Sequence, residues 1–187
     1  MRVIAGLAKG KQLKTPEGMQ TRPTTDRVKE ALFSIIQFEI PGARVLDLFG
    51  GTGQLGIEAL SRGAQSAVFV DAREDACKLI RENLKRTGFS DKAQVIRGDY
   101  LDYLIQCKDK FDIVLLDPPY AEVFLENALK FITEIDILQS GGIIISERPV
   151  GKDLPWDFLG FTRSRDYKYG TTLLTLYRKQ NAEQDSV

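Results

Sequence analysis

Asp117-Pro118-Pro119-Tyr120 combines a carboxylate, two stiff carbonyl groups and an aromatic ring, directly after the apolar run 111–116. Two consecutive prolines end a strand, because neither has an N–H to donate to a ladder and each fixes its own φ. The four residues are therefore predicted at the carboxyl edge of a sheet, where open α/β proteins bind ligands. A carboxylate and a carbonyl there can accept both N–H bonds of an exocyclic base amine, and the ring can stack on a flipped-out base. The alternative is an ordinary turn with Tyr120 in the core.

A glycine-rich turn, Gly50 to Gly53, follows a predicted strand over 44–49 and precedes a predicted helix over 57–61. Glycines at such a turn let the backbone approach a ligand closely. Gly51, Gly53 and Gly56 match the GxGxxG pattern, so a dinucleotide is one candidate ligand. Asp47 favours another, because it would repel a phosphate but can pair with an ammonium group. Adenosine carrying a methionine tail therefore fits better than adenosine with a diphosphate.

Two further carboxylates follow predicted strands in the same way. Asp71 ends the strand 66–70, and Asp99 follows the strand 93–97. Asp71 lies twenty positions after Gly51, where a dinucleotide-binding unit has its ribose-binding acid, and Asp99 is placed to accept from an adenine amino group. The structural alternatives remain open for both, since Asp71 can cap the next helix and Asp99 can be a turn residue.

The N-terminal segment 1–23 is expected to be an extension, with residues 1–6 and 11–14 pairing as a hairpin. Residues 1–30 hold seven basic and three acidic side chains, a local excess of four positive charges on a chain whose net charge is zero. This excess is either a phosphate-binding surface or a solvated hairpin face. A helix with Thr or Asp as its N-cap is predicted after Pro23, and Pro41-Gly42 ends it.

Strands alternate with helices from Val45 to Ser146, which predicts a doubly wound parallel sheet. Two last strands, 160–167 and 171–177, are joined by about three residues, too few for a parallel crossover, so the final strand must run antiparallel. The prediction is an α/β fold with a mostly parallel seven-stranded sheet, divided into an extension 1–23, a domain 24–180 and a frayed tail 181–187.

Composition excludes several kinds of chemistry. The chain has 187 residues and no histidine, which removes Ser-His-Asp and Cys-His catalysis and most zinc sites. Cys77 and Cys107 show no CxxC spacing, which indicates reduced cytosolic thiols. With no signal peptide and no apolar run of membrane-spanning length, we expect a cytoplasmic protein that does not bind a membrane. We also expect no bound metal.

These motifs together resemble a known family. The glycine turn, the acidic end of the second strand and Asp117 to Tyr120 are similar to class I S-adenosylmethionine-dependent methyltransferases. More closely, residues 2–6, Arg22-Pro23-Thr24-Thr25-Asp26-Arg27, residues 46–53 and Asp117 to Tyr120 resemble the RsmD family, over nearly the whole chain. The family more often has Phe-Ala-Gly-Ser-Gly where this chain has Phe49 to Gly53. Both versions keep the turn open and keep a hydroxyl.

The resemblance implies a Rossmann-like enzyme that methylates the exocyclic N2 amine of a guanine in bacterial 16S rRNA, with S-adenosylmethionine as cofactor and the rRNA or 30S subunit as partner; we expect a monomer. It implies catalytic roles for Asp117, Pro118 and Tyr120. It implies that the cofactor is held by Asp47, Phe49, Gly50, Gly51, Thr52, Gly53, Asp71, Ala72, Asp99 and Tyr100. It implies that RNA is bound by Arg2, Lys9, Lys11, Arg22, Thr24 and Arg27.

Other functions stay open from the sequence alone. An adenine-N6 DNA methyltransferase shares the Asp-Pro-Pro-Tyr motif, although the chain has little room for a target-recognition domain. A glutamine methyltransferase would have Asn at the position of Asp117. An NAD-dependent oxidoreductase would use the glycine pattern with Tyr or Lys as its acid–base group. A noncatalytic RNA-binding module would not need Asp117.

Overall fold

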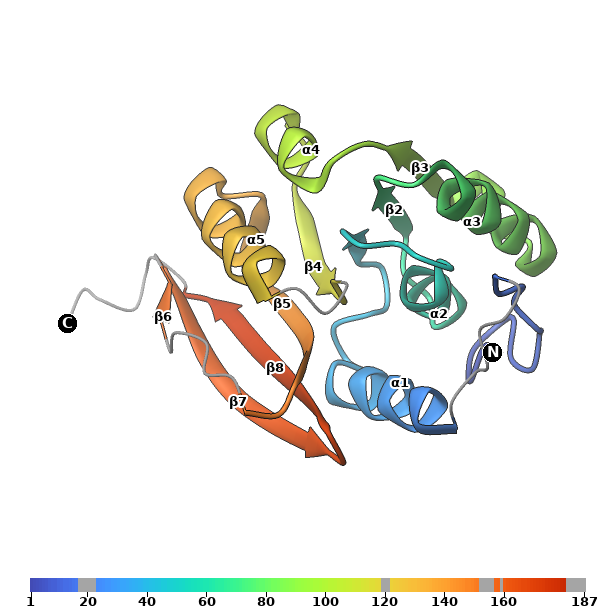
Figure 1. The fold of residues 1–187 in the computed structure, drawn as a ribbon, viewed down its shortest axis with the longest axis horizontal. Helices are drawn as coiled ribbons and strands as arrows, with labels where there is room; N and C mark the ends of the chain where they lie inside the picture. Colours follow the sequence, from blue (N-terminus) through green and yellow to red (C-terminus); the bar gives the residue numbers. More distant parts are fainter. Residues whose placement is uncertain (17–22, 119–121, 152–156, 159, 181–187) are drawn as a thin grey trace.

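The structure is a computed structural model that describes residues 1–16, 23–118, 122–151, 157–158 and 160–180. Helices and strands alternate along the chain (Figure 1): α1 (Pro23–Ile35), β1 (Arg44–Asp47), α2 (Gln54–Ser61), β2 (Ser66–Asp71), α3 (Glu74–Thr87), η1 (Ser90–Lys92), β3 (Ala93–Arg97), α4 (Tyr100–Gln106), β4 (Phe111–Leu116), α5 (Glu122–Ile135), β5 (Leu138–Pro149), β6 (Asp157–Phe158), β7 (Phe161–Tyr169) and β8 (Thr172–Lys179).

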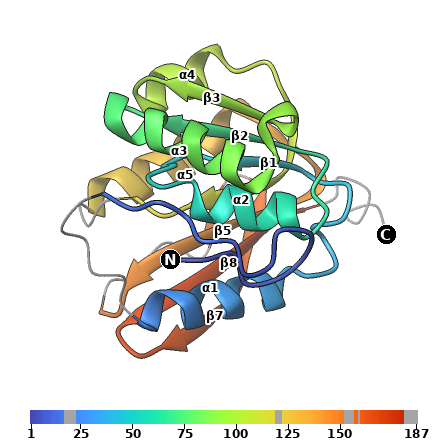
Figure 2. The same cartoon turned by 90° about the vertical axis from the view of Figure 1, so that its right-hand side faces the viewer.

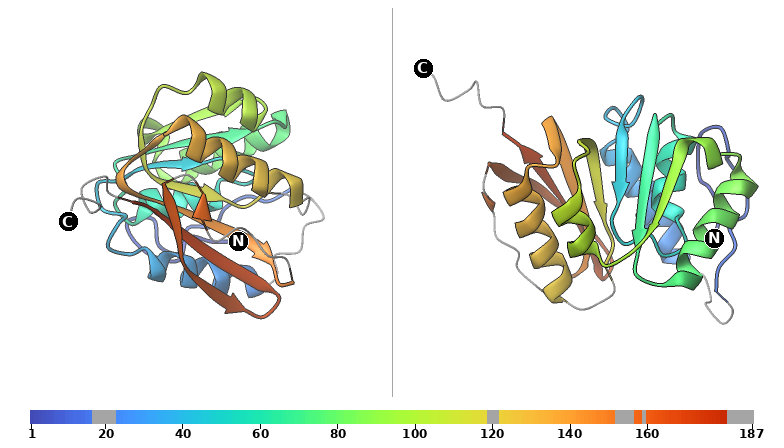
Figure 3. Two further views of the ribbon diagram at one scale, coloured as in Figure 1. Left: turned by 90° about the vertical axis from the view of Figure 1, so that its left-hand side faces the viewer. Right: turned by 90° about the horizontal axis from the view of Figure 1, so that it is seen from above.

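The strands form one sheet in the order β3-β2-β1-β4-β5-β8-β7-β6. The first five are parallel, and β8 lies antiparallel between β5 and β7. The predicted Rossmann-like sheet, with seven strands and an antiparallel end, is confirmed; β6 adds a two-residue edge strand. Figure 3 shows the strands side by side in this single sheet.

Two hydrophobic clusters cover the two faces of the sheet. One joins alternate strand residues such as Val45, Leu115 and Ile145 to α1, α2 and α3. The other joins the intervening residues, such as Leu46 and Val114, to α4 and α5. The central strands are buried on both faces, which explains their continuous apolar sequences. Figure 1 shows the helices above and below the strands.

Helix α1 begins at Pro23, so Thr24, Thr25 and Asp26 lie in its first turn. The prediction that Thr or Asp is the N-cap was therefore wrong. Proline suits the first helical position, because its N–H would have no intrahelical partner there and its φ is already helical. Helix α4 was not predicted, because it is only seven residues long.

The first residues of the chain pair back as a hairpin, with a bridge between Arg2 and Gln12. Val3, Ala8 and Leu13 are buried in the same cluster as α1 and α2. The hairpin is thus packed onto the main domain through its own apolar residues. The division at residue 23 stays a prediction.

One buried carboxylate holds the hairpin in place. Glu58 of α2 is fully buried and accepts the N–H groups of Ile4 at 2.8 Å and Ala5 at 3.0 Å. Its charge is paired with Arg62 at 2.8 Å and with Lys29 of α1 at 3.7 Å. Glu58 therefore ties the hairpin, α1 and α2 into one unit.

None of the helices in the described ranges is long and apolar enough to cross a membrane.

We predict that Glu58→Gln lowers the free energy of unfolding by about 3–5 kcal/mol, because it leaves the charge of Lys29 buried without its partner. Urea denaturation measures this change. Glu82→Gln is the matched control, since Glu82 pairs with Lys14 on the surface and its loss should cost about 0–1 kcal/mol. Equal effects of the two substitutions would contradict this role of Glu58.

Candidate active site

The glycine turn after β1 is folded by its own backbone and by Asp71. Gly51 and Gly53 have φ of 55° and 78°, values that favour glycine. The N–H of Gly51 donates to Asp71 Oδ2 at 2.8 Å. At Gly50 a Cβ would lie 2.8 Å from Ile80 Cδ1. The alanine that the family more often has there would thus press on a flexible methyl group, which can move.

The third glycine of the pattern, Gly56, has a packing role. A Cβ at Gly56 would lie 2.3 Å from the ring of Phe69, so α2 can approach the sheet only with glycine here. The N–H of Gly56 also donates to Asp47 Oδ2 at 3.0 Å. The turn thus supplies a close backbone approach around Gly50 to Gly53 and a buried carboxylate beneath it.

The carboxylates of Asp71 and Asp99 both bond to the backbone two residues further on. Asp71 does not cap α3, whose N-cap is Arg73, and Asp99 caps a helix instead of forming only a turn. Asp71 Oδ1 accepts from Arg73 N at 2.9 Å, just before α3. Asp99 is the N-cap of α4, and its Oδ1 accepts from Leu101 N at 2.8 Å. A carboxylate oxygen has two lone pairs, so neither bond prevents the predicted contacts with ribose and adenine. Those contacts stay predictions.

Three aromatic rings pack together at this edge of the sheet. The ring centroids of Phe49 and Tyr100 lie 5.1 Å apart, and Phe124 of α5 lies 5.7 Å from Tyr100 and 6.5 Å from Phe49. Phe124 is 36% exposed. Sequence reasoning did not single it out, because one aromatic residue at the start of a helix carries no specific signal. Its cluster offers an apolar wall beside Asp99.

Three carboxylates lie on one face of neighbouring strands. Asp47 ends β1, Asp117 follows β4, and Glu147 lies in β5. Two residues earlier on each strand, Val45, Leu115 and Ile145 belong to the cluster beneath α1, α2 and α3. Because side chains alternate along a strand, the three carboxylates face the same side.

Burial raises the pKa of all three groups, and repulsion by neighbouring carboxylates adds to the shift at Asp47 and Glu147. Burial, followed by the nearby charges of Asp117 and Asp71, raises the pKa of Asp47 to about 8, although the Gly56 N–H opposes this shift. Burial raises the pKa of Asp117 to about 6. Burial and then the charge of Asp117 raise the pKa of Glu147 to about 8. Such a site favours a cationic ligand, which stabilises the ionised forms.

The site therefore fits the cofactor predicted from the sequence. S-adenosylmethionine carries an ammonium and a sulfonium group, which suit a buried carboxylate beside an open backbone turn. Gln54 Oε1, at the first position of α2, is buried with no hydrogen-bond partner in the described part of the chain. A ligand donor at the glycine turn would satisfy it.

The basic residues divide between two edges of the molecule. Arg2 is exposed, pairs with Asp26 at 3.4 Å and follows Met1, whose sulfur lies 3.3 Å from Thr52 Oγ1. Arg27 is exposed on the first turns of α1. Both lie toward the glycine turn and the carboxyl edge. Figure 2 shows the start of α1 on the same side as the arrowhead of β5.

Lys9 and Lys11 lie elsewhere. The closed end of the hairpin contacts Ser61 at the end of α2, where Leu7 N donates to Ser61 O at 2.7 Å. Lys11 donates to Thr87 O at the end of α3. These helix ends lie toward the opposite edge of the sheet, so the structure does not bring Lys9 and Lys11 to Asp117. A contact of these lysines with RNA stays a prediction.

For the remaining predicted site residues the structure gives only part of the surroundings or none. Tyr120 and Arg22 lie outside the described residues, and Thr24 is described only as part of α1. Pro118 is partly buried directly after Asp117, and Ala72 is exposed after β2.

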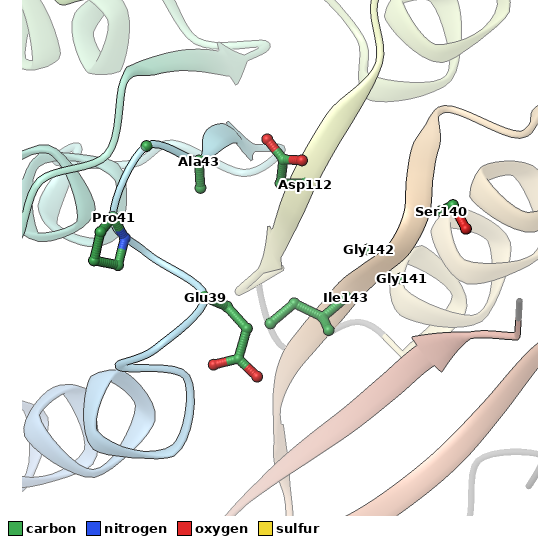
Figure 4. A pocket seen from close by; sticks show the side chains of 9 residues that line it. Glu39, Pro41, Ala43, Asp112, Ser140, Gly141, Gly142 and Ile143 are labelled. Atoms are coloured by element: carbon green, nitrogen blue, oxygen red, sulfur yellow. The ribbon is translucent and has the colours of Figure 1, made fainter.

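Two surface pockets lie away from the three carboxylates. One, of about 260 Å³, opens at the amino edge of β1, β4 and β5 (Figure 4) and is lined by Glu39, Pro41, Ala43, Asp112, Ser140 and Ile143 among others. The other, of about 540 Å³, lies between β3 and α4 and has Asp99 among its lining residues. Only the second touches a predicted site residue.

Comparison with known proteins places the chain in a family. The family model described as "Conserved hypothetical protein 95" matches residues 1–178. The chain is 31% identical over 180 residues to ribosomal RNA small subunit methyltransferase D of Escherichia coli, covering 96% of this chain and 90% of the relative. The chain belongs to the RsmD family.

A second sequence relative and two solved structures of methyltransferases are also similar to this RsmD-family protein. It is 40% identical over 183 residues to the putative rRNA methyltransferase YlbH of Bacillus subtilis, covering 96% of this chain and all of the relative. The solved structure of the putative methyltransferase yhhF from Escherichia coli has a TM-score of 0.85 and 30% identity, covering 97% of this chain and 98% of that one. An RNA methyltransferase from Salinibacter ruber in complex with S-adenosyl-L-homocysteine has a TM-score of 0.67 at 16% identity, covering 89% and 97%, and shares the fold.

We predict that Asp47→Asn stabilises the free protein and weakens cofactor binding. In the folded protein the pKa of Asp47 is about 8, against 3.8 ordinarily, so the folded state retains a proton that the unfolded state has lost. Its contribution to stability is therefore full below pH 4 and is lost as the pH rises toward 8. Asparagine does not ionise, so the Asp47→Asn protein does not lose this stability as the pH rises.

The melting temperature of the free Asp47→Asn protein should exceed that of the wild type by several degrees at pH 8, and the difference should shrink toward pH 5. Calorimetric titration with S-adenosylhomocysteine should show at least about tenfold weaker binding. Asp91→Asn, an exposed change in η1, is the control. A lower melting temperature at pH 8 together with unchanged binding would show that Asp47 only supports the loop.

Proposed function

We propose that the protein transfers a methyl group from S-adenosylmethionine to the exocyclic N2 amine of a guanine in 16S rRNA of the small ribosomal subunit. The observation that carries this proposal is the position of Asp117 and Pro118, at the carboxyl edge of β4 and on the same edge as the glycine turn after β1. The methyl donor and an amine-binding carboxylate thereby share one edge of the sheet.

Membership of the family gives the type of reaction and the cofactor. The RsmD-family relatives are named rRNA methyltransferases, and solved structures of the same fold hold S-adenosylhomocysteine. S-adenosylmethionine is the cofactor, and the protein is an RNA methyltransferase. These relatives do not favour the alternative of an adenine-N6 DNA methyltransferase.

In the proposed mechanism the residues position the amine and the cofactor. The lone pair of an exocyclic amine is delocalised into the base, so the free amine is a poor nucleophile. Asp117 and the carbonyl of Pro118 accept its two N–H bonds and turn the lone pair toward the methyl group. This contribution is positioning and electrostatic stabilisation. When bound, the cofactor supplies an electrophilic methyl group on its sulfonium.

The reaction balances without a covalent intermediate on the protein. The amine nitrogen would gain the methyl group as the bond of that group to the sulfonium breaks and leaves a neutral thioether, and the amine would release one proton to solvent. Asp117, with a pKa of about 6, is mostly ionised at neutral pH and can accept an N–H bond throughout. Tyr120 would stack on the base.

The RNA-binding surface is proposed around Arg2 and Arg27, which are exposed toward the carboxyl edge. Arg22 and Thr24 belong to the same sequence segment and are proposed to join it. Guanidinium groups pair well with phosphates, so these residues would hold the backbone on either side of the flipped guanine.

We predict that Asp117→Ala lowers kcat by at least about 100-fold, because it removes one of the two groups that orient the amine. Asp117→Asn should lose less, since its amide oxygen can still accept one N–H. Binding of S-adenosylhomocysteine should stay within about threefold in both variants, and Asp102→Asn, an exposed change on α4, is the control.

The assay measures transfer from labelled S-adenosylmethionine to 30S subunits that lack the modification, with free 16S rRNA and duplex DNA alongside, followed by nucleoside analysis. Label on N2-methylguanosine at a single site supports the proposed function. Label on DNA, or full activity of Asp117→Ala, would overturn it.

A further inference from the structure

Glu147 is the carboxylate of the site that the mechanism above does not use. β4 and β5 are parallel neighbours, with Leu116 paired with Ser146. The next residue on each strand is Asp117 and Glu147. The two carboxylates therefore lie side by side at the carboxyl edge, on the face that also carries Asp47.

The position of Glu147 is rigid. It lies inside β5 and pairs with Leu174 of the antiparallel strand β8. A side chain on a paired strand has a fixed direction, unlike one on a loop. Glu147 is partly buried, so part of it stays accessible from the active-site edge.

The neighbouring arginine does not neutralise it. Arg148 points to the other face of the sheet, where its guanidinium bonds to Thr175 Oγ1 at 3.1 Å and to Asp166 Oδ2 at 3.0 Å. Among the described residues, the side-chain carboxylate of Glu147 has no hydrogen bond and no ion pair. The fold thus keeps an unpaired carboxylate next to the group that binds the target amine, which costs stability and calls for a partner supplied by a ligand.

The chemistry of the bases identifies that partner. The Watson–Crick edge of guanine carries an N1–H donor directly beside its N2 amine. Adenine has an acceptor at N1 beside its N6 amine. The N2 amine of guanine lies between N1–H and N3, and N1–H is the one of these two groups from which a carboxylate beside Asp117 can accept a hydrogen bond. A carboxylate there attracts a donor and repels an acceptor.

We propose that Glu147 accepts a hydrogen bond from guanine N1–H and thereby selects guanine over bases whose N1 is an acceptor. This inference rests on the proposed function, because it takes the N2 amine of guanine as the target. It assigns Glu147 a role in specificity that is separate from the positioning of the amine by Asp117.

The test compares two RNA strands, ligated into 16S rRNA, that carry either guanosine or 2-aminopurine at the target position. Both have the N2 amine, but 2-aminopurine has an acceptor at N1. Measurements at pH 8.5 keep Glu147 ionised, since its pKa is about 8. The wild type should prefer guanosine by about 10- to 100-fold in kcat/KM, the range of one hydrogen bond to a charged group.

Glu147→Gln should reduce this preference to less than about fivefold, because its amide can donate to N1 of 2-aminopurine and accept from N1–H of guanine. Glu147→Ala, which does neither, should also lose the preference, mainly through lower activity on guanosine. Glu126→Gln, which removes an exposed carboxylate from α5, is the matched control and should keep the preference of the wild type. Melting temperatures confirm that each variant is folded.

The outcomes separate the two proposals. If the wild type methylates guanosine and both Glu147 variants keep its preference, the role of Glu147 is wrong and the proposed function stands. If the wild type does not methylate guanosine on N2, the proposed function fails and this inference fails with it.

Discussion

The burial of three neighbouring carboxylates at one edge of the sheet is the constraint on which the proposed function depends. Asp47 is 1% exposed, and its oxygen Oδ2 accepts one N–H, that of Gly56. Asp117 and Glu147 follow on the next two strands of the same face. Burying carboxylates together costs free energy, which a cationic cofactor and an amine donor can offset. The site is therefore ready for ligands that carry positive charge or N–H groups.

The rest of the fold holds this edge together. Gly56 lets α2 approach Phe69 closely enough for its N–H to reach Asp47. Asp71 fixes the glycine turn through Gly51 N and leads into α3 through Arg73 N. On the far side of α2, Glu58 holds the N-terminal hairpin and places Arg2 near the start of α1. A single helix thus supports both the glycine turn and the hairpin that carries Arg2, part of the proposed RNA-binding surface.

The sequence predicted most of the sheet because the signals are local. The strands 93–97 and 111–116 were predicted with the bounds that the structure has, and the short link before Gly170 correctly required an antiparallel pair. The insertion of β8 between β5 and β7 was not predicted, since strand order depends on packing far along the chain. The start of β5 at Leu138 was not predicted either, because its glycines at 141 and 142 lie inside the strand.

The sequence predicted the carboxylates of the site but not the arrangement of its basic and aromatic residues. The motifs identified Asp71, Asp99 and Asp117 because each stands at the end of a predicted strand, and Asp47 because it precedes the glycine turn. The sequence does not show which end of the hairpin lies near these carboxylates. Lys9 and Lys11 were therefore grouped with Arg2, although their end of the hairpin contacts the far ends of α2 and α3. The cluster of Phe124 with Phe49 and Tyr100 joins residues far apart in sequence, and periodicity does not reveal such contacts.

The most direct test of the central claim is the number of protons released when S-adenosylmethionine binds at pH 7. Calorimetry in buffers of different ionisation enthalpy measures this number. With the pKa of Asp47 at about 8 in the free protein, binding that ionises Asp47 should release roughly half to one proton per cofactor. Asp47→Asn should remove most of this release. Binding with no proton release in the wild type would contradict the claim that a cationic ligand ionises the buried carboxylates.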